Sequence, residues 1–279
     1  MTEQDIALND GHSMPRLGYG LWQIDDARAE SLVGSAIATG FRHFDTAQAY
    51  YNEAGVGRGV RSAVIPREQL FVTSKLRGRD MGHTSALKSF DESLKRLGLD
   101  YIDLFLIHWP MPAHDRYVAT WKALIEIRGS GRARSIGVSN FTAAHVDRLV
   151  RETGVVPAVN QLELHPHFQQ RGIRPHHERL GIIVQSYSPL GSSGAAVLRS
   201  EVVRSIAAKH QHTPAQVILR WHLEQGLAPL PKTSREARLA ENLAVWDFSL
   251  DESDMAQLRS LDRPHGNTQP FPDQMNSSF

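Results

Sequence analysis

Four ionisable side chains lie at or just after the ends of short apolar runs, where a packed core has no use for them. They are Asp45, Lys75 and His108, which end the runs 41–45, 70–75 and 104–108, and Tyr50, which stands five residues after the first run. An unpaired charge is costly to bury. Catalysis at the rim of a barrel, in contrast, needs such groups at strand ends. We therefore interpret the chain as an enzyme.

A phenol, an ammonium, a carboxylate and an imidazole together indicate proton transfer. Tyrosine and lysine both titrate near pH 10 in water. If Lys75 lies beside Tyr50, its charge favours the phenolate and brings the pKa of the phenol toward neutrality. Asp45 then holds the ammonium in place, and His108 orients a substrate oxygen. Each residue alone also fits a structural role, so it is their joint position at three successive strand ends that indicates catalysis.

Strand-like and helix-like segments alternate along the chain, and these elements must position the four residues. Near-continuous apolar runs are typical of parallel strands buried on both faces. The predicted strands are Arg16–Gly20, Arg42–Asp45, Leu70–Lys75, Ile102–His108, Ser135–Ser139, Ala158–Gln161, Ile182–Tyr187 and Leu227–Leu230. Helical periodicity marks Ala27–Thr39, Thr84–Leu97, Tyr117–Arg128, Thr142–Arg151, Glu201–His210 and Pro214–Gln225. Gly40 and Gly98 stand where helices end, and Thr213 stands where the last of these begins.

Eight strand–helix units predict a single (β/α)8 TIM barrel over residues 1–279. An open doubly wound sheet is the competing fold, but its glycine fingerprint fails here, because Gln23 stands where the third glycine belongs. The turn Asn9-Asp10-Gly11 predicts a short N-terminal β-hairpin that closes the bottom of the barrel. The C-terminal tail after Leu261 is expected to be irregular and to lie over the active-site face.

A cluster of cations follows the last predicted strand. Residues 231–238 read Pro-Lys-Thr-Ser-Arg-Glu-Ala-Arg, with three cations and two hydroxyls in eight residues. Barrels often bind phosphate at this loop, at the N-terminus of a helix. Cations at a helix start are otherwise unfavourable to its dipole. We interpret the segment as a phosphate site.

Composition excludes several other classes. There are 31 Lys and Arg against 30 Asp and Glu, so the net charge of +1 gives no electrostatic case for nucleic acid or a membrane surface. The absence of cysteine excludes disulfides and thiolate chemistry. The pairs His165–His167 and His176–His177 lack matching carboxylates, so we expect no metal site. No signal peptide or membrane span is visible, which indicates a cytoplasmic protein.

Three ordered motifs resemble those of the aldo-keto reductase family. The first reads Gly-Phe-Arg-His-Phe-Asp-Thr-Ala at 40–47, followed by Tyr50, Asn52, Glu53 and Gly57; the second is 134–141; the third is Leu-Pro-Lys-Thr at 230–233 with Arg235, Arg238, Glu241 and Asn242. The similarity extends from about Ile6 to about Asp262. Within the family the chain is most similar to the bacterial 2,5-diketo-D-gluconate reductase branch.

The resemblance implies an NADPH-dependent reductase that converts aldehydes or ketones to alcohols. Tyr50 would be the general acid, tuned by Lys75 and Asp45, and His108 would orient the carbonyl. The implied cofactor contacts are Ser139, Asn140 and Gln161 at the nicotinamide carboxamide, Tyr187 stacked on its ring, Leu190 and Gly191, then Lys232, Thr233, Ser234, Arg235 and Arg238 around the 2′-phosphate, and Glu241 and Asn242 at the adenine. Hydride transfer to the carbonyl carbon would accompany protonation by Tyr50.

Four aromatic residues depart from the diketogluconate branch or crowd the expected pocket. Trp22, Tyr51 and Trp109, with Phe271 from the tail, are expected to line the substrate site together with His108. The substrate implied by the branch is 2,5-diketo-D-gluconate or a related small carbonyl compound; if the aromatic rings line the site, a sugar acid becomes less certain and apolar or aromatic carbonyls become plausible. Ordinary packing is the alternative. Two other functions stay open: a non-catalytic NADPH-binding regulatory or structural protein on this scaffold, and an aldolase that uses Lys75 as a Schiff base. The oligomeric state expected from the branch is a monomer.

Overall fold

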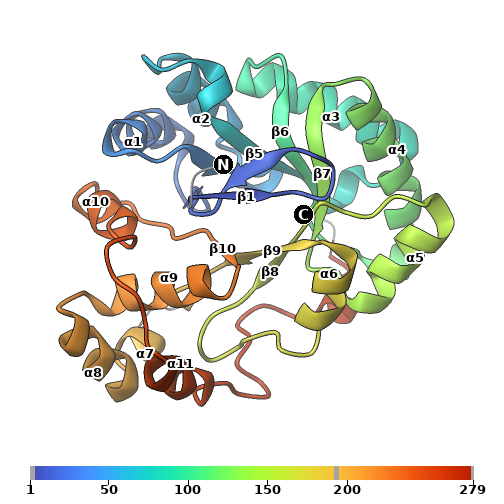
Figure 1. The fold of residues 1–279 in the computed structure, drawn as a ribbon. Helices are drawn as coiled ribbons and strands as arrows, with labels where there is room; N and C mark the ends of the chain where they lie inside the picture. The colour runs from blue at the N-terminus through green and yellow to red at the C-terminus, as the bar shows by residue number, and fades with distance from the viewer. Residues whose placement is uncertain (1–3, 192–194, 278–279) are drawn as a thin grey trace.

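The computed structural model describes residues 4–191 and 195–277, so residues 192–194 and both ends of the predicted domain lie outside the description. Figure 1 shows helices packed around a central set of strands. The strands are β3 (Tyr19–Gly20), β4 (His43–Asp45), β5 (Phe71–Leu76), β6 (Ile102–Ile107), β7 (Ala133–Ser139), β8 (Val159–Glu163), β9 (Ile183–Tyr187) and β10 (Ala228–Pro229). All eight predicted strands are confirmed.

The eight strands form one parallel sheet in chain order, from β3 to β10. Two backbone hydrogen bonds join the ends of this sheet. The Gly18 N–H donates to the Pro229 carbonyl at 3.1 Å, and the Gly20 N–H donates to the Pro231 carbonyl at 3.0 Å. The sheet therefore closes on itself, and the predicted α/β barrel is confirmed.

The helices follow the strands along the chain. They are α1 (Asp26–Thr39), α2 (Glu53–Arg61), α3 (His83–Leu97), α4 (Tyr117–Gly129), α5 (Ala143–Thr153), α6 (Arg174–Leu180), α7 (Ala195–Leu198), α8 (Glu201–His210), α9 (Pro214–Glu224), α10 (Ala237–Leu243) and α11 (Glu252–Arg259). The six predicted helices are confirmed, as are the ends at Gly40 (φ 120°) and Gly98 (φ 64°) and the start of α9 at Thr213. The structure adds that Thr213 and Gln216 form a capping box there.

Helix α2 escaped prediction because three glycines lower its intrinsic helix propensity. The structure explains one of them. A Cβ atom on Gly57 would lie 1.9 Å from the carbonyl oxygen of Leu97, at the end of α3. Gly57 therefore allows α2 to approach the α3 terminus closely. Helices α6, α7, α10 and α11 are short, and their apolar periodicity is too brief to read in the sequence.

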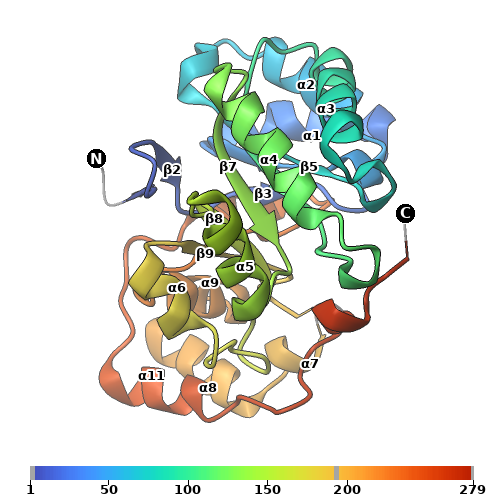
Figure 2. The same ribbon diagram turned by 90° about the vertical axis from the view of Figure 1, so that its right-hand side faces the viewer.

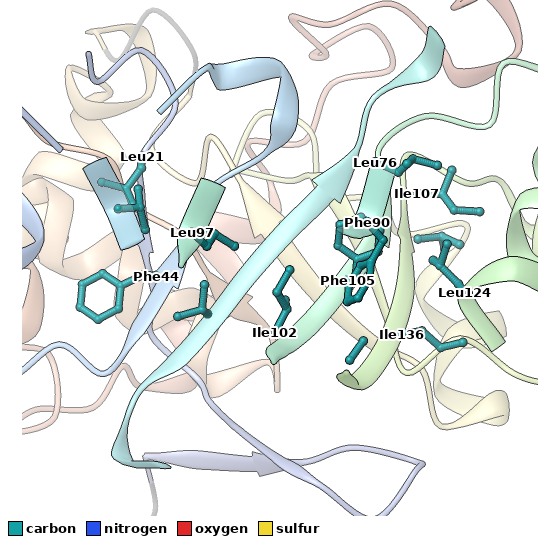
Figure 3. Close-up of a cluster of buried hydrophobic side chains, with 14 of the residues drawn as sticks. Leu21, Phe44, Leu76, Phe90, Leu97, Ile102, Phe105, Ile107, Leu124 and Ile136 are labelled. Carbon is teal, nitrogen blue, oxygen red and sulfur yellow. The ribbon is translucent and has the colours of Figure 1, made fainter. Parts of the chain in front are cut away.

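Alternation along the strands separates the barrel interior from the surface that packs on helices. In β6, Phe105 and Ile107 point toward the helices, and the Phe105 ring meets Phe90 of α3 edge to face at a centroid distance of 4.9 Å (Figure 3). Leu104 and Leu106 belong instead to a smaller interior cluster with Met14. The same period of two carries His108 to the inner side at the carboxyl end of its strand.

A hairpin and a tail cover opposite ends of the barrel. The predicted hairpin is confirmed as β1 (Asp5–Ala7) paired antiparallel with β2 (Ser13–Pro15). Figure 2 places it at one end of the barrel and the C-terminal tail at the other, toward which the β7 arrow points. The tail contains one short 3₁₀ turn, Pro272–Gln274. It therefore lies on the face where parallel strands end and barrel enzymes place their active sites.

Candidate active site

Lys75 is the centre of the site and is fully buried on β5. Its Nζ atom donates three hydrogen bonds: to Asp45 Oδ1 at 2.6 Å, to the Thr46 carbonyl at 3.0 Å and to the Tyr50 hydroxyl at 3.3 Å. An ammonium has three donors, so all of them are used. The structure thus brings together three of the four predicted catalytic residues around one nitrogen.

The charge state of Lys75 follows from these contacts. Burial acts to lower the pKa of Lys75, but attraction to Asp45 and Tyr50, with hydrogen bonds to both, outweighs burial, and the net shift of the pKa is upward. Asp45 is itself buried, and its second oxygen accepts a hydrogen bond from Gln161 Nε2 at 2.8 Å. Lys75 is therefore a fixed cation beside the phenol.

Tyr50 corrects one expectation from the sequence. Lys75 was predicted to bring the pKa of the phenol toward neutrality, and its charge does act in that direction. Burial is the larger effect, however, and the pKa of Tyr50 is raised above its ordinary value. The phenol therefore keeps its proton at neutral pH, which is the state that a general acid needs.

His108 packs against the phenol from the next strand. The Tyr50 and His108 rings meet edge to face, with centroids 5.8 Å apart. Burial, with the nearby Lys75 charge, lowers the pKa of His108 well below its ordinary value. The imidazole is therefore neutral and is suited to orient an oxygen by hydrogen bonding rather than by charge.

Three of the residues implied to hold a carboxamide form a connected group. Ser139 Oγ donates to the Gln161 carbonyl at 2.9 Å and accepts from Asn140 Nδ2 at 3.1 Å. Asn140 also donates to the His108 carbonyl and accepts from the Tyr187 hydroxyl at 2.9 Å. Asn140 has a positive φ of 62°, a conformation that Asn tolerates better than most residues. The group thus joins the ends of β6, β7, β8 and β9.

The predicted phosphate loop presents its cations to solvent. Lys232, Arg235 and Arg238 are exposed, and none of them forms an ion pair with any residue that the structure describes. The buried Thr233 fixes the loop, because its hydroxyl accepts from the Arg235 N–H at 3.0 Å. Ser234 is exposed between them. Unpaired cations on an ordered loop suit an anionic ligand.

Sequence reasoning missed two supports of this loop. The Tyr19 hydroxyl donates to the Thr233 carbonyl at 2.5 Å, and Arg28 of α1 donates to the Ser234 carbonyl at 3.2 Å. Burial raises the pKa of Tyr19 to about 12, with the charge of Arg28 opposing, so the hydroxyl remains a donor. The only signal in the sequence was that Tyr19 lies in the first predicted strand, which a closed barrel places beside the last strand and the loop that follows it.

The remaining residues implied at the cofactor have structural contacts of their own. Glu241 accepts from the Thr213 hydroxyl at 2.8 Å and so ties α10 to the start of α9. Asn242 is buried on the same helix. Leu190 is half-buried, and the Gly191 N–H closes a turn on the Ser188 carbonyl at 2.8 Å. These positions stay predictions.

Aromatic side chains are exposed around the mouth. Trp22, Tyr51 and Phe271 are 44%, 69% and 40% exposed, respectively, whereas Trp109 is buried. The Asn52 side chain donates to the carbonyls of the loop after β3, which connects the loop of Trp22 to that of Tyr51. Exposed large apolar residues on a soluble domain mark binding surfaces when they gather. Their role at a substrate site remains a prediction.

The tail is fixed to the mouth by Glu163, which the sequence analysis did not single out because the predicted strand stopped at Gln161. The buried Glu163 carboxylate accepts from Thr268 Oγ1 at 2.6 Å, from the Thr268 N–H at 2.8 Å and from the Gln269 N–H at 3.0 Å. Burial raises the pKa of Glu163, but hydrogen bonds from His165 and the tail outweigh burial and lower it overall. A cavity of about 280 Å³ lies under the tail, bordered by Asn140, Tyr187 and Phe271 among others.

Other features lie apart from this site. His176 pairs with Asp147 at 2.7 Å, and His177 accepts from Asn160 at 2.7 Å. Among the described residues, no group of three His, Asp or Glu side chains is placed to hold a metal ion. A cleft of about 730 Å³ opens at the hairpin end, beside Asn9 and Arg134. Within the same residues no helix is both long and apolar enough to cross a membrane.

The arrangement fits a phosphorylated dinucleotide. The predicted phosphate loop presents Lys232, Arg235 and Arg238, which pair with no acidic side chain among the described residues. Gln161 Nε2 donates hydrogen bonds to Asp45 Oδ2 and to Gln185 Oε1, whereas Gln161 Oε1 receives no hydrogen bond from the described residues. Gln161 thus retains an acceptor for an amide donor, and Tyr187 beside it is only partly covered.

Comparison with known proteins gives a consistent result. The sequence profile of the aldo/keto reductase family matches residues 16–263. An aldo-keto reductase from Mycolicibacterium smegmatis is 46% identical over 257 residues, which cover 92% of this chain and 93% of that protein. Methylglyoxal reductase DkgA of Escherichia coli K12 is 45% identical over 258 residues, with the same coverage.

Solved structures agree. The apo form of Gox0644 has a TM-score of 0.94 and 45% identity, and the match covers 99% of both chains. A Gox0644 mutant in complex with NADPH has a TM-score of 0.94 and 44% identity, with the same coverage. Because the profile spans most of the sequence and several relatives exceed 40% identity over nearly all of it, the chain belongs to the aldo/keto reductase family.

Proposed function

We propose that this aldo/keto reductase reduces small aldehydes and ketones to alcohols with NADPH, and that Tyr50 donates the proton. Membership of the family makes the chain an NADP-dependent oxidoreductase acting on carbonyl groups. The assignment of individual residues is ours. The observation that carries it is the Lys75 ammonium, which lies between Asp45 Oδ1 at 2.6 Å and the Tyr50 hydroxyl at 3.3 Å.

Each catalytic residue has one role. His108, held neutral by burial, donates a hydrogen bond to the carbonyl oxygen and orients it. Tyr50 donates its proton to that oxygen as negative charge develops. Lys75 stabilises the resulting phenolate, since its positive charge is fixed by Asp45. Replacement of any of the three therefore affects the same step.

The residues that would hold the cofactor extend from the mouth to α10. Ser139, Asn140 and Gln161 would hold the carboxamide, and Tyr187 would pack on the ring. Lys232, Thr233, Ser234, Arg235 and Arg238 surround the 2′-phosphate; Leu190, Gly191, Glu241 and Asn242 complete the contacts. Bound NADPH supplies the hydride that the carbonyl carbon receives. The similarity to a structure solved with NADPH supports this assignment.

The preferred substrates are small reactive carbonyl compounds, with methylglyoxal as the first candidate. Relatives named methylglyoxal reductase are 45% identical to this chain over 258 residues. Trp22, Tyr51 and Phe271 are exposed and Trp109 is buried; if these rings line the mouth, they would favour short aliphatic or aromatic carbonyls over a charged sugar acid. A panel of methylglyoxal, benzaldehyde and 2,5-diketo-D-gluconate, assayed with NADPH and with NADH, tests this order.

Replacement of Tyr50 by Phe tests the proposed mechanism. The variant keeps the ring but lacks the transferable proton, so kcat for methylglyoxal should fall about 100- to 10,000-fold. The Kd for NADPH, measured by quenching of tryptophan fluorescence, should stay within about twofold of the unmodified protein. Substantial turnover by Tyr50→Phe would contradict the role of Tyr50. NADPH binding without turnover in the unmodified protein would favour the regulatory alternative.

We further propose that residues 1–279 act as one cytoplasmic, monomeric domain. The catalytic and cofactor residues assigned above all lie on this chain. Light scattering during size-exclusion chromatography tests the monomer. A dimer whose dissociation abolishes activity would contradict it.

A further inference from the structure

A line of buried, hydrogen-bonded side chains runs inside the barrel from the N-terminal hairpin to Asp45. His43 Nδ1 lies 3.1 Å from the Pro15 carbonyl, and His43 Nε2 lies 3.4 Å from Gln185 Nε2. Gln185 Oε1 accepts from Gln161 Nε2 at 2.6 Å. Gln161 Nε2 also donates to Asp45 Oδ2 at 2.8 Å. The side chains of His43, Gln161 and Gln185 are at most 1% exposed.

The two ends of the line independently fix its direction. A carboxylate can only accept, so Gln161 must turn its nitrogen toward Asp45. The Pro15 carbonyl can also only accept, so His43 carries its proton on Nδ1, and His43 Nε2 becomes an acceptor. Burial lowers the pKa of His43 to about 4, which keeps the ring neutral. Both ends require the same orientation of Gln185, with its oxygen toward Gln161 and its nitrogen toward His43.

This direction determines what Gln161 can offer a ligand. Its nitrogen is shared between Asp45 and Gln185, and no donor among the described residues reaches its oxygen. A terminal amide torsion is otherwise broad and roughly two-fold, so Asp45 alone would leave Gln161 free to tilt. The second acceptor, Gln185 Oε1, defines the plane of the Gln161 amide.

We propose that Gln185 is a positioning residue, which holds the Gln161 amide so that its nitrogen fixes Asp45 and its oxygen receives the amide N–H of the nicotinamide carboxamide. This inference rests on the proposed function, because it assigns the carboxamide to Gln161. Gln185 acts only through Gln161 and does not touch the reacting atoms. A packing role alone would require volume at this position but not an acceptor.

Gln185→Met removes the acceptor and keeps the length of the side chain. The Kd values to compare are those of NADPH and of its 3-acetylpyridine analogue, in which a methyl ketone replaces the carboxamide and no N–H remains. We expect the unmodified protein to prefer NADPH. The variant should lose about three- to tenfold of that preference, the effect of one hydrogen bond, while the Kd of the analogue stays within about twofold. Equal weakening of both cofactors, or an unchanged preference, would overturn the proposal.

Thr73→Val is the matched control. Thr73 Oγ1 donates to the same His43 Nε2 atom at 3.0 Å but lies outside the link between Gln185 and Gln161. The control disturbs the same buried region with an equally small change, so it should keep the preference for NADPH. A loss as large as that of Gln185→Met would show a general packing effect and overturn the proposal.

A measurement without cofactor separates this inference from the proposed function. In the unliganded protein, the side-chain amide protons of Gln161 should exchange slowly with solvent by NMR. Exchange should be faster in Gln185→Met and unchanged in Thr73→Val. Unchanged protection in Gln185→Met overturns the positioning role even if NADPH binds as proposed. If the protein binds NADPH and its analogue equally well while exchange still responds to Gln185, the carboxamide assignment is the part that fails. Gln185→Leu serves as the second apolar variant if the Met variant does not fold.

Discussion

At the scale of single residues, one ammonium group determines the geometry of the site. Lys75 has no exposed surface, and its three donors are used by one carboxylate, one carbonyl and one phenol. A buried ion pair contributes little net stability, whereas removal of one partner leaves an uncompensated buried charge. Lys75 therefore affects both activity and stability, and mutations of Lys75 and Asp45 can show how much of the stability effect comes from its charge.

Lys75→Met should lower the free energy of unfolding by about 3–5 kcal/mol, because Asp45 is left buried without a counter-ion. The double variant Lys75→Met with Asp45→Asn should recover part of that loss, since no unpaired charge remains. Both variants should be inactive toward carbonyl substrates. Urea unfolding monitored by circular dichroism measures the difference. A double variant as unstable as the single one would show that packing, not charge, causes the loss.

The cations of the phosphate loop belong to the same scale. Lys232→Ala and Arg238→Ala should each weaken NADPH binding by about tenfold, near the lower end for a charged hydrogen bond, because both side chains are exposed and screened by salt. NADH, which lacks the 2′-phosphate, should bind almost as before. Lys122→Ala, an exposed lysine on α4, is the control. Equal losses for NADPH and NADH would argue against a 2′-phosphate contact.

At the scale of elements, the sequence predicts strands better than it predicts what lies between them. Apolar runs predict all eight barrel strands. Asp45, Lys75 and His108 end three of these runs, and they could be predicted to lie together because parallel strands bring their carboxyl ends to one face. The upward shift in the pKa of Tyr50 could not be foreseen, since it depends on how the ring packs in the folded chain. Glu163 was missed because the predicted strand stopped two residues before it, and its partners lie 105 residues away in an irregular tail.

The tail should be released by a change at Glu163. Glu163→Gln keeps one acceptor oxygen but places a donor nitrogen where the other oxygen faces the N–H groups of the tail, so part of the hydrogen bonding from Thr268 and Gln269 should be lost. A broadly specific protease such as proteinase K should then cut within the tail much faster, and KM for carbonyl substrates should rise more than kcat falls. Mass spectrometry of timed digests measures cleavage. Glu152→Gln on the exposed face of α5 is the control, and equal resistance of both variants would contradict the anchoring role of Glu163.

At the scale of the whole molecule, buried neutral histidines make stability depend on pH. Burial lowers the pKa of both His43 and His177 to about 4 in the folded state, against an ordinary value of 6.5. The nitrogens His43 Nε2 and His177 Nε2 accept hydrogen bonds, so protonation must break them. Between pH 6.5 and 4 the unfolded chain therefore binds more protons than the folded one.

The free energy of unfolding should accordingly be highest above pH 6.5 and fall as the pH decreases toward 4. Each such histidine contributes a slope of up to about 1.4 kcal/mol per pH unit. His177→Gln keeps an acceptor for Asn160 without a titrating ring and should reduce the slope by about one proton. His12→Gln, on the exposed hairpin turn, should leave it unchanged. Urea unfolding at pH 7, 6 and 5 gives the slope of the free energy of unfolding against pH for the unmodified protein and for each of the two variants.

The attachment of the tail also affects how related reductases can come to differ in substrate preference. Two of the three donors that Glu163 receives from the tail are main-chain N–H groups, which any amino acid except proline can provide. Side chains beyond that point can therefore be exchanged without loss of these main-chain hydrogen bonds to Glu163. Grafting the last ten residues of a relative onto this scaffold should transfer the relative's substrate preference among carbonyl compounds and leave the chemical step unchanged.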